Sequence, residues 1–451
     1  NFSAGPGAVP TEVLEQAQRE MLSYQGTGMS FMELSHRDAD GPVQTTMSQA
    51  VERVRKLLSV PDNYHVLFFT GGAHAQFAAV PLNLRRGKSM AQYVVTGFWS
   101  NRAMDEGAKQ ITAKKIDGLN GKRIRPVSEW GVSPDAAYVH ICLSETIDGI
   151  EFLDDRELPH GVPLVADATS TLLSRRLDVT KSSAHLSARV TPHLRRYGLI
   201  YASAGKNLGP AGVTLVIVRD DLIHNPDPKV PSVLSYSAFA SSKPIPSVYH
   251  TPPTYHIYML NLVLGHHLDT LGGLARVEQR AIRRAAAVYG AIDASTFYTN
   301  TVPQEFRSRM SVPINIAPKG EQDKDLEQAF VREATAKGLH QLFGHPIKGG
   351  LRVTLYNGVP DAAVDAVGWT AQPCITQRHA DIVDTQRGAQ RRTSTRRTHH
   401  QHVTPLPTSP GYLVPQGVRG QAHDDPCQVE SPPPITANTP LFSFPIHHGV
   451  G

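Results

Sequence analysis

The sequence predicts an α/β protein in three parts: a large domain built on a mainly parallel sheet, a smaller α/β domain, and a disordered tail. Two observations predict the folded parts. Short apolar runs alternate with stretches of helical spacing, which is typical of parallel strands joined by helices, and strand-like runs return after a long helical stretch late in the chain. A third observation, a change of composition after about Gly368, predicts the tail.

The first part of the chain begins with a predicted helix over residues 11–24, where apolar residues recur with helical spacing behind a Thr cap and an acidic first turn. Strand-like runs follow, each ending in small or polar residues: 64–84 (strand, glycine turn, helix), 91–100, 136–146, 161–170 and 197–207. Ligands usually bind at the carboxyl ends of parallel strands. We therefore expect the functional site where these runs end.

A second, smaller α/β domain is indicated by a long helical pattern over residues 272–293 and by strand-like runs at 308–317 and 349–358. We expect the large domain to span residues 13–275, and the small domain to combine residues 1–12 with 276–367.

Two segments break the pattern. Residues 181–195 are polar, have no period and interrupt a strand-to-strand connection, so we interpret them as an atypical insert. Residues 368–451 contain proline clusters and no lysine, since Lys348 is the last one in the chain. Such a composition does not bury enough apolar surface to offset chain entropy, which predicts a disordered, low-complexity tail.

Composition excludes several classes of protein. The formal net charge of +5 is modest for 451 residues and favours neither nucleic acid nor a membrane surface. The three cysteines, Cys142, Cys374 and Cys427, form no CxxC pair, so we expect no disulfide framework and no metal site. No apolar run is long enough to span a bilayer. We expect a cytoplasmic protein, and an organellar targeting peptide upstream of Asn1 stays open.

The segment "YGLIYASAGKNLGPAG" (197–212) places a lysine, Lys206, at a small-residue turn between two apolar runs. A lysine in such a place is costly unless it is solvated, paired or used in chemistry. Asp167 ends another run, and a glycine turn before a helix at 70–77 offers backbone N–H groups for a phosphate. A Schiff-base lysine, an acid facing a pyridinium nitrogen and a phosphate cup describe a pyridoxal phosphate site, with Trp99 placed to stack on the ring.

Each of these residues also has an ordinary structural interpretation. A lone lysine after a strand is more often a surface residue, and a lone aspartate is more often a turn or helix cap. Trp99 on its own is more often a core residue. The conjunction of the residues favours the cofactor site more than any one of them does.

Seven motifs stand in an order that resembles the phosphoserine aminotransferase family: "NFSAGPGAVP", "FMELSHR", "GFWS", "ETIDGIEF", "AGKNLGPAGVT", "TPPTY" and "GGLRVTLYN". The resemblance covers about residues 1–366, apart from 181–195. It implies a class-V, fold-type-I transferase that depends on pyridoxal phosphate and is a homodimer. It also implies the reaction of L-serine biosynthesis that moves an amino group between glutamate and 3-phosphohydroxypyruvate, with phosphoserine and 2-oxoglutarate as the other partners.

The resemblance assigns the cofactor site residue by residue. It makes Lys206 the lysine that forms the Schiff base and Asp167 the partner of the pyridinium nitrogen. Trp99 would stack on the ring, and Thr146 would contact the ring hydroxyl. The remaining positions surround the phosphate and are Ala73, His74 and Gly205, with His250 and Thr251 reaching it from the other subunit.

The resemblance also assigns the substrate site. Arg352 matches the arginine that holds the substrate α-carboxylate. His36, Arg37 and His345 match the group around the distal phosphate or carboxylate. A guanidinium fork suits both anions, so one site can accept phosphoserine and glutamate in turn.

Three positions depart from the family pattern. Gly205 stands where the family usually has Gln, His250 where it usually has Asn, and Pro346 where it often has Arg. Two other hypotheses therefore accompany the leading one. The chain could be another fold-type-I transaminase, of the kind that acts on alanine, serine and glyoxylate, or a catalytically impaired relic.

Overall fold

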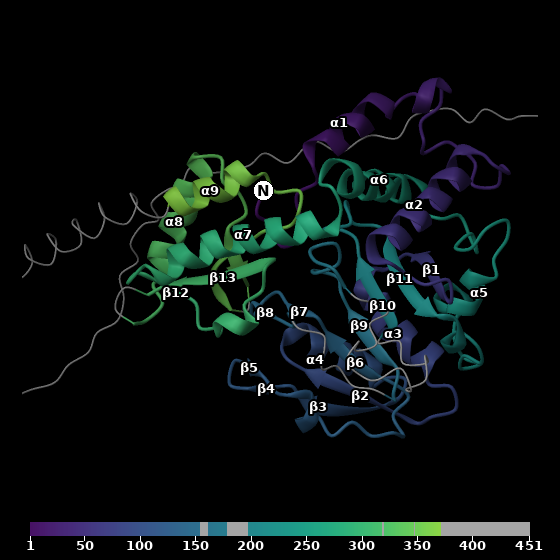
Figure 1. The fold of residues 1–451 in the computed structure, drawn as a ribbon, viewed down its shortest axis with the longest axis horizontal. Coiled ribbons are helices and arrows are strands. Elements are labelled where there is room, and N and C mark those ends of the chain that lie inside the picture. The colour runs from purple at the N-terminus through teal and green to yellow at the C-terminus, as the bar shows by residue number, and fades with distance from the viewer. Residues whose placement is uncertain (154–160, 178–196, 318–319, 347, 371–451) are drawn as a thin grey trace, which may run out of the picture. The chain divides into compact units, whose positions relative to one another are not determined.

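A seven-stranded sheet, in the order β1-β11-β10-β9-β6-β2-β3, forms the centre of the larger part of the fold (Figure 1). The computed structural model describes residues 1–153, 161–177, 197–317, 320–346 and 348–370, which all belong to one structural unit. The strands of this sheet are β1 (Tyr64–Phe69), β2 (Met90–Val95), β3 (Thr112–Asp117), β6 (Val139–Cys142), β9 (Leu164–Asp167), β10 (Tyr197–Ser203) and β11 (Thr214–Arg219).

The sheet is mainly parallel, as predicted. Strands β3, β2, β6, β9 and β10 pair in parallel, and only β11 runs antiparallel to its neighbours β10 and β1 within the described sheet. The carboxyl ends of the central strands therefore meet at one edge, where a ligand site is expected.

Both faces of this sheet are buried. Along β10, for example, Ile200 and Ala202 join one hydrophobic cluster while Leu199 and Tyr201 join another, which is the two-residue alternation of a strand with two covered faces. Helices α2 (Pro42–Leu58) and α6 (Thr254–Gly265) cover the first face. Helices α3 (Gly72–Leu84), α4 (Phe98–Gly107) and α5 (Tyr236–Ala240) contribute to the cluster on the second face (Figure 1).

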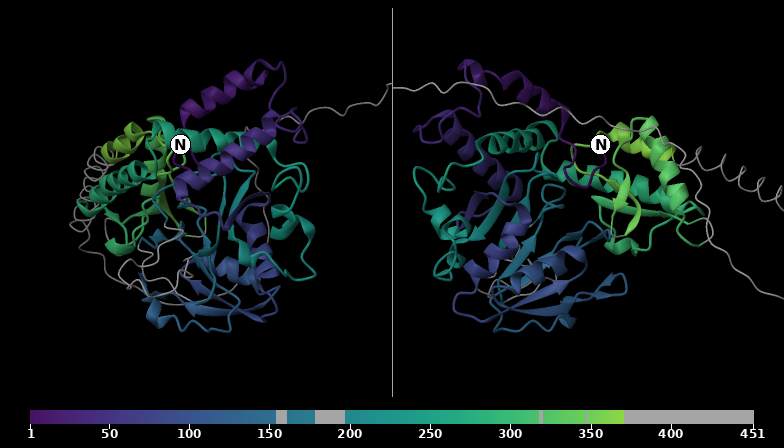
Figure 2. Two further views of the ribbon diagram at one scale, coloured as in Figure 1. Left: turned by 45° about the vertical axis from the view of Figure 1, so that its right-hand side comes forward. Right: turned by 180° about the vertical axis from the view of Figure 1, so that it is seen from behind.

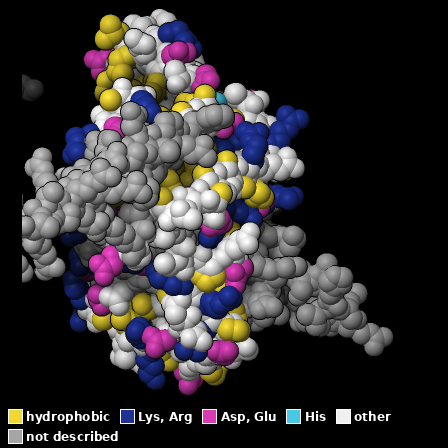
Figure 3. All heavy atoms as spheres, turned by 90° about the vertical axis from the view of Figure 1, so that its left-hand side faces the viewer, with side chains coloured by type: hydrophobic (Ala, Val, Ile, Leu, Met, Phe, Trp, Pro, Cys, Tyr) yellow, Lys and Arg dark blue, Asp and Glu magenta, His cyan; other side chains and the backbone are white. Residues whose placement is uncertain are grey.

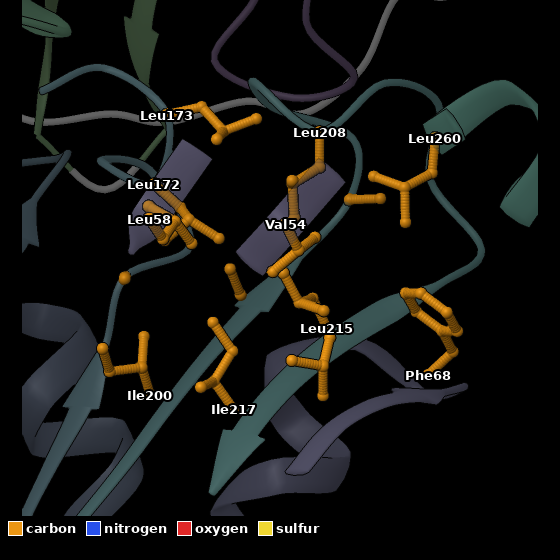
Figure 4. Close-up of a cluster of buried hydrophobic side chains, with 14 of the residues drawn as sticks. Val54, Leu58, Phe68, Leu172, Leu173, Ile200, Leu208, Leu215, Ile217 and Leu260 are labelled. Carbon is orange, nitrogen blue, oxygen red and sulfur yellow. The ribbon is translucent and has the colours of Figure 1, made fainter. Parts of the chain in front are cut away.

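The core of the first face is a layer of aliphatic side chains from the strands and helices (Figure 4). Leu215 and Ile217 of β11 lie between Val54 of α2 and Ile200 of β10, and all four are fully buried. Burying an aliphatic side chain of this size contributes about 1.5–3 kcal/mol. This layer holds the strand ends in register, and so positions the residues that follow them.

A second, four-stranded antiparallel sheet has the order β12-β13-β15-β14. Its strands are β12 (Tyr298–Thr299), β13 (Ser311–Ile316), β14 (Phe343–His345) and β15 (Gly349–Thr354), and its helices are α7 (Leu274–Asp293), α8 (Lys324–Ala336) and α9 (Asp361–Thr370). These elements share a hydrophobic cluster of their own, which Phe2 at the amino end of the chain joins. Figure 2 shows this part from two further sides. The exact domain bounds, 13–275 and 1–12 with 276–367, stay a prediction.

The predicted first helix is shorter than expected. Helix α1 covers Thr11–Glu20, and its cap residue is Pro10, so Thr11 is the first helical residue and does not cap the helix. A short 3-10 turn, Tyr24–Gly26, follows, in which Gln25 has a positive φ of 47° and cannot continue an α-helix. The amphipathic spacing predicted the helix, and the extended backbone of Ser23 (φ −150°, ψ 93°) is why it does not extend through residue 24.

Two small hairpin-like pairs complete the described strands: β4 (Leu119–Asn120) with β5 (Arg123–Ile124), and β7 (Ser144–Glu145) with β8 (Ile150–Glu151). The predicted insert 181–195 and residues 371–451 of the predicted tail lie outside the described residues. Residues 368–370, which the sequence predicts as the start of the tail, instead belong to helix α9 (Asp361–Thr370), because the helical turn continues through them.

The surface in Figure 3 carries Lys and Arg side chains interspersed with Asp, Glu and apolar side chains. Among the described residues, no helix combines the length and the apolar character that crossing a membrane requires. The same residues contain no group of three or more His, Cys, Asp or Glu side chains placed to hold a metal ion.

Candidate active site

A cavity of about 190 Å³ opens at the carboxyl ends of the central strands, on the side of the sheet that α3 and α4 cover. Cys142, Asp167 and Ser203 line it from the ends of β6, β9 and β10. The other lining residues that bear on function are Gly72, Ala73, His74, Trp99, Thr146 and Lys206. Six of the predicted site residues therefore meet in one cavity, from segments that are far apart in the sequence.

Lys206 stands on the turn that follows β10. Gly205 makes this turn with a positive φ of 96°, and a Cβ there would also approach the Cβ of Ala211 to 3.2 Å. A glycine suits this backbone, and the Gln of the family pattern would be strained in it. Gly205 itself does not line the cavity in the described structure. Its contribution is the turn that points Lys206 into the cavity.

The amine of Lys206 is held by the amino end of the chain. Its Nζ donates a hydrogen bond to the backbone oxygen of Ala4, and the Tyr356 hydroxyl donates to the same oxygen at 3.1 Å. The amine lies 5.6 Å from the centre of the Tyr356 ring. A Cβ on Gly5 would come within 2.6 Å of Nζ, so the small residue at position 5 leaves room for the amine.

The electrostatics of the cavity favour a neutral lysine. Burial and the nearby Arg352 cation lower the pKa of Lys206 from 10.5 to about 8, and the Asp167 carboxylate opposes this only in part. An amine with this pKa is uncharged in about half of the molecules near pH 8, where an ordinary lysine is almost fully charged. It can then act as a nucleophile, which a surface lysine rarely does.

Asp167 lines the same cavity at the end of β9. It is the last residue of β9, it is 6% exposed, and its Oδ1 accepts a hydrogen bond of 2.9 Å from the Thr169 backbone N–H. Burial raises the pKa of Asp167, while hydrogen bonds from Thr169 and Tyr201 and the charge of Lys206 lower it. A buried carboxylate that faces a cavity needs a cationic partner, and a ligand could supply one.

The amino end of helix α3 forms a third wall. Gly71, its cap residue, has a φ of 86°, and Gly72 has a φ of 66°, conformations that favour glycine. Gly71 has no side chain to cap the first turn, and Gly72, Ala73 and His74 of that turn line the cavity. Free N–H groups and the positive end of a helix dipole suit an anion such as phosphate.

Trp99 and Thr146 also line the cavity, and they contact each other. Trp99 lies in the first turn of helix α4, rather than at the end of a strand, because β2 already ends at Val95. Its indole Nε1 donates a hydrogen bond of 3.1 Å to Thr146 Oγ1. The tryptophan ring is therefore oriented by a threonine that lines the same cavity.

Glu145 holds the first turn of helix α4, which carries Trp99, and sequence reasoning did not single it out. The fully buried carboxylate accepts hydrogen bonds of 2.8 Å from the backbone N–H groups of Trp99 and Ser100, and one of 2.5 Å from Ser100 Oγ. It satisfies N–H groups that the first turn of α4 leaves open, and its charge matches the helix dipole.

We predict that Glu145→Gln lowers the free energy of unfolding by about 1–3 kcal/mol, because the amide replaces one acceptor oxygen with a donor that faces other donors. The tryptophan fluorescence should change as well. Chemical denaturation and an emission spectrum measure both effects. Glu106→Gln, in the last turn of the same helix, is the control and should alter neither, since the ion pairs of Glu106 with Arg102 and Lys109 lie at the surface. Equal behaviour of the two variants would contradict the role given to Glu145.

The predicted substrate residues of the small sheet lie beside this cavity. Arg352 of β15 donates from Nη1 to the backbone oxygen of Thr146 at 3.3 Å, and its charge reaches Lys206. His345, Lys348 and Arg352 line a neighbouring cavity of about 140 Å³ together with Lys122 and Asp148, and Lys348 pairs with Asp148. Three cationic side chains against one carboxylate leave this second cavity suited to an anion.

Four predicted site residues line neither cavity. His36, Arg37, His250 and Thr251 are absent from the described lining of both. Arg37, His250 and Thr251 are exposed, and His36 is half-buried. Within one chain these side chains lie at or near the surface, so one chain alone does not account for their predicted roles.

Other residues at the site were missed by sequence reasoning. Ala4 and Gly5 contact the amine of a lysine 202 residues later in the chain, and no local pattern signals that contact. Tyr201 and His140 lie within strands and look like ordinary core positions. The run of small residues "SAGPG" near the amino end was a signal of a close approach that could have been used.

The aminotransferase class-V family matches residues 1–367 of the chain. The chain belongs to this family. The phosphoserine aminotransferase of Nitrosomonas europaea is 44% identical over 372 residues, which cover 80% of this chain and 94% of that protein. The phosphoserine aminotransferase of Acinetobacter baylyi is 43% identical over 371 residues, which cover 81% of this chain and 96% of that protein. The resemblance inferred from the seven motifs is confirmed.

Solved structures of the family superpose on the same fold. Phosphoserine aminotransferase from Bacillus circulans subsp. alkalophilus matches with a TM-score of 0.75 and 37% identity, covering 84% of this chain and 98% of that one. The PLP-bound phosphoserine aminotransferase of Trichomonas vaginalis matches with a TM-score of 0.74 and 36% identity, covering 82% of this chain and 98% of that one. An alanine–glyoxylate aminotransferase from Nostoc sp. matches with a TM-score of 0.62 at 18% identity, which shows the shared fold alone. The predicted fold-type-I class is confirmed.

Proposed function

We propose that the chain is a phosphoserine aminotransferase that uses pyridoxal phosphate. It transfers an amino group between phosphoserine and 2-oxoglutarate, giving 3-phosphohydroxypyruvate and glutamate, a step of L-serine biosynthesis. The observation that carries the proposal is the meeting of Lys206 and Asp167 in one cavity, between the amino end of α3 and Trp99, in a chain whose relatives bear this name.

The residues of the cavity fit pyridoxal phosphate. The buried Asp167 carboxylate offers a partner for a ring N–H, the open first turn of α3 offers donors for a phosphate, and Trp99 offers a face for the ring. Thr146 Oγ1 lies beside Trp99, where it can contact a ring hydroxyl. When bound, the cofactor supplies a conjugated ring that withdraws electrons from the substrate Cα.

Lys206 performs two tasks in this proposal. Its amine would hold the cofactor covalently, and once released it would carry the proton at the substrate Cα. The lowered pKa suits both tasks, because the amine must be neutral to attack and to accept a proton. The contact with Ala4 holds the amine on the side of the cavity from which it acts.

We predict that attachment of pyridoxal phosphate to the cofactor-free chain accelerates as the pH rises and levels off above about pH 8. The pKa of Lys206 is lowered to about 8, so the reactive neutral amine is the minority form below that pH and the majority form above it. Stopped-flow absorbance of the bound cofactor at a series of pH values measures the rate. A rate that keeps rising up to the ordinary lysine pKa would contradict the lowered value.

The residues proposed to bind the substrate anions lie at and beside the second cavity. Arg352 lies between the two cavities, since it contacts Thr146 of the first and lines the second, so it can bind the α-carboxylate next to the cofactor. His345 and Lys348 of the second cavity can then receive the distal phosphate of phosphoserine or the distal carboxylate of glutamate. Lys348 follows Pro346 closely and offers a charge near the position where the family often has Arg.

We infer that a homodimer completes the site. His36, Arg37, His250 and Thr251 do not line the cavity of their own chain, yet they match family positions around the cofactor phosphate and the substrate anion. A two-fold dimer would bring the same surface of one copy to the cavity of the other, in both directions. The exposed apolar residues Leu14, Leu22, Met29 and Met32 lie on the chain segment just before His36 and support an interface there.

Complementation between two impaired variants tests this inference. As pure dimers, Lys206→Ala should be inactive toward phosphoserine, and Arg37→Ala should retain only a small fraction of the wild-type activity. When the two are unfolded and refolded together, mixed dimers contain one site with both native residues, so about a quarter of the wild-type activity should return. No recovery, with mixed dimers shown to form by mass spectrometry, would place Arg37 at the site of its own chain.

We predict a difference between the two substrate arginines. Arg352→Ala should weaken turnover of both phosphoserine and alanine, since both present an α-carboxylate. Arg37→Ala should weaken turnover of phosphoserine and glutamate and spare alanine, which has no distal anion. Loss of one contact between an arginine and an anion should lower kcat/KM by the equivalent of about 2–5 kcal/mol of activation free energy. Steady-state kinetics measures this, and equal losses for alanine and phosphoserine in Arg37→Ala would contradict its assignment.

A coupled assay with purified chain, pyridoxal phosphate, phosphoserine and 2-oxoglutarate tests the proposed function directly. Alanine with glyoxylate is the rival pair, and the rival transaminase class would prefer it. Turnover of neither pair would favour the impaired relic.

We place the reaction in the cytoplasm, which the buried free thiol of Cys142 supports, because such a thiol persists in a reducing compartment.

A further inference from the structure

Behind the cofactor cavity, three buried polar side chains lie in a row across three neighbouring strands. His140 is on β6, Asp167 on β9 and Tyr201 on β10, and each is no more than 6% exposed. The mechanism above uses Asp167 alone. Burying a histidine and a tyrosine hydroxyl in an otherwise apolar layer is costly unless they do something there.

The register of the sheet places the three on one face. Tyr201 and Asp167 are direct partners in the parallel pair β10–β9, and Cys142, two residues after His140, is the direct partner of Asp167 in the pair β6–β9. Since side chains alternate along a strand, His140, Asp167 and Tyr201 all point to the side that carries the cavity. The contacts agree with this placement, because Tyr201 Oη lies 2.8 Å from His140 Nε2, and the Tyr201 side chain, the register partner of Asp167, acts on Asp167 as a hydrogen-bond partner that lowers its pKa.

The direction of these hydrogen bonds follows from a count of hydrogens. The Tyr201 hydroxyl has one hydrogen, so if it donates to the Asp167 carboxylate, its oxygen must accept from His140 Nε2–H. Burial lowers the pKa of His140 to about 3, so the ring is neutral and carries its one hydrogen on Nε2 in this arrangement. His140 Nδ1, which has no hydrogen-bond partner in the described part of the chain, is then a bare acceptor and not an unpaired N–H.

We propose that Tyr201 and His140 are positioning residues: His140 orients the Tyr201 hydroxyl so that it donates to the Asp167 carboxylate, which keeps Asp167 ionised opposite the ring nitrogen of the cofactor. The opposite direction, from a protonated Asp167 through Tyr201 to His140 Nε2, would leave a buried N–H at Nδ1 without a partner and would remove the charge that a pyridinium needs. This inference rests on the proposed function, since it concerns the group that faces the cofactor.

Other charged groups face Asp167, and some favour its ionised form while others disfavour it. Lys206, on the turn after β10, lowers the pKa of Asp167. Glu145, which follows β6, carries a charge of the same sign as Asp167 and repels it. The Cys142 thiol on β6 would do the same if it lost its proton. Burial is the largest influence and raises its pKa. The hydrogen bond from Tyr201 therefore opposes desolvation at a place where the carboxylate would otherwise tend to take up a proton.

The test is the protonation of the ring nitrogen in the loaded enzyme. Wild type, Tyr201→Phe and Tyr138→Phe are loaded with pyridoxal phosphate labelled with ¹⁵N in the ring, and the ¹⁵N chemical shift is followed over pH. Tyr138→Phe is a matched control, because its hydroxyl is also buried on this face and forms a 2.5 Å hydrogen bond, but to Tyr93.

In Tyr201→Phe the ring nitrogen should lose its proton at a pH lower by about one unit or more, and kcat should fall about tenfold with little change in KM. Tyr138→Phe should titrate as wild type does. His140→Leu should shift the titration in the same direction by a smaller amount, and it keeps the test open if Tyr201→Phe folds poorly.

An unchanged titration in both Tyr201→Phe and His140→Leu would overturn the inference, as would an equal shift in Tyr138→Phe. Those outcomes leave the proposed function intact, because wild type would still bind the labelled cofactor. A wild-type chain that binds no pyridoxal phosphate would overturn both.

Discussion

Replacing Lys206 by alanine should abolish transamination and leave the fold intact. The variant loses the amine that attaches the cofactor and also the group that moves the proton at the substrate Cα. General acid–base catalysis alone contributes 10²–10⁴-fold, so kcat should fall by roughly 10⁴ or more. Rate measurements with phosphoserine and 2-oxoglutarate test this, and circular dichroism checks the fold.

Two further observations belong to the same experiment. Borohydride should fix pyridoxal phosphate to Lys206 of the wild-type chain, which peptide mass spectrometry would show. In the variant, no cofactor should be fixed at position 206. Lys109→Ala, at an exposed position beyond helix α4, is the control and should keep wild-type turnover. Near-normal turnover in Lys206→Ala would remove the basis of the proposed function.

Replacing Asp167 by asparagine should lower kcat by roughly 10²–10³, the usual effect of removing one electrostatic group aimed at the reacting system. Asparagine has nearly the same size and can still accept the hydrogen bond from the Thr169 N–H. It carries no charge, however, so it does not stabilise a protonated ring nitrogen. Steady-state kinetics measures the loss, and absorbance of the bound cofactor verifies that the variant is loaded.

A chemical control separates charge from position. A cofactor analogue that is methylated on the ring nitrogen keeps a permanent positive charge and does not depend on Asp167 for protonation. In Asp167→Asn it should recover part of the lost activity relative to the natural cofactor. If the analogue gives no recovery, or if the variant is as active as wild type, Asp167 does not act through the charge of the ring.

The sequence predicted those parts of the site that local patterns encode. Lys206 was found because an apolar run, a small-residue turn and a second apolar run are local features, and Asp167 was found because it ends such a run. The same reasoning placed Trp99 at a strand end, whereas the chain turns at Gly97 and Trp99 already belongs to helix α4. Spacing predicts that an element exists better than it predicts where the element begins.

Contacts between distant segments were not predictable in this way. The hydrogen bond from Lys206 to Ala4, and the row formed by His140, Asp167 and Tyr201, depend on which strands become neighbours in the sheet. A histidine or tyrosine inside an apolar run has the same local pattern whether it is a core residue or a partner of Asp167. Glu145 was missed for a related reason, since the helix that it caps begins 47 residues earlier in the chain.

A single spectrum tests the central claim most directly. Purified chain loaded with pyridoxal phosphate should lose the visible absorption of the attached cofactor when phosphoserine alone is added, because the amino group passes to the cofactor and Lys206 is released. The absorption should return when 2-oxoglutarate is then added, with one equivalent of glutamate formed per site. A spectrum that responds to alanine and glyoxylate but not to phosphoserine and 2-oxoglutarate would contradict the claim.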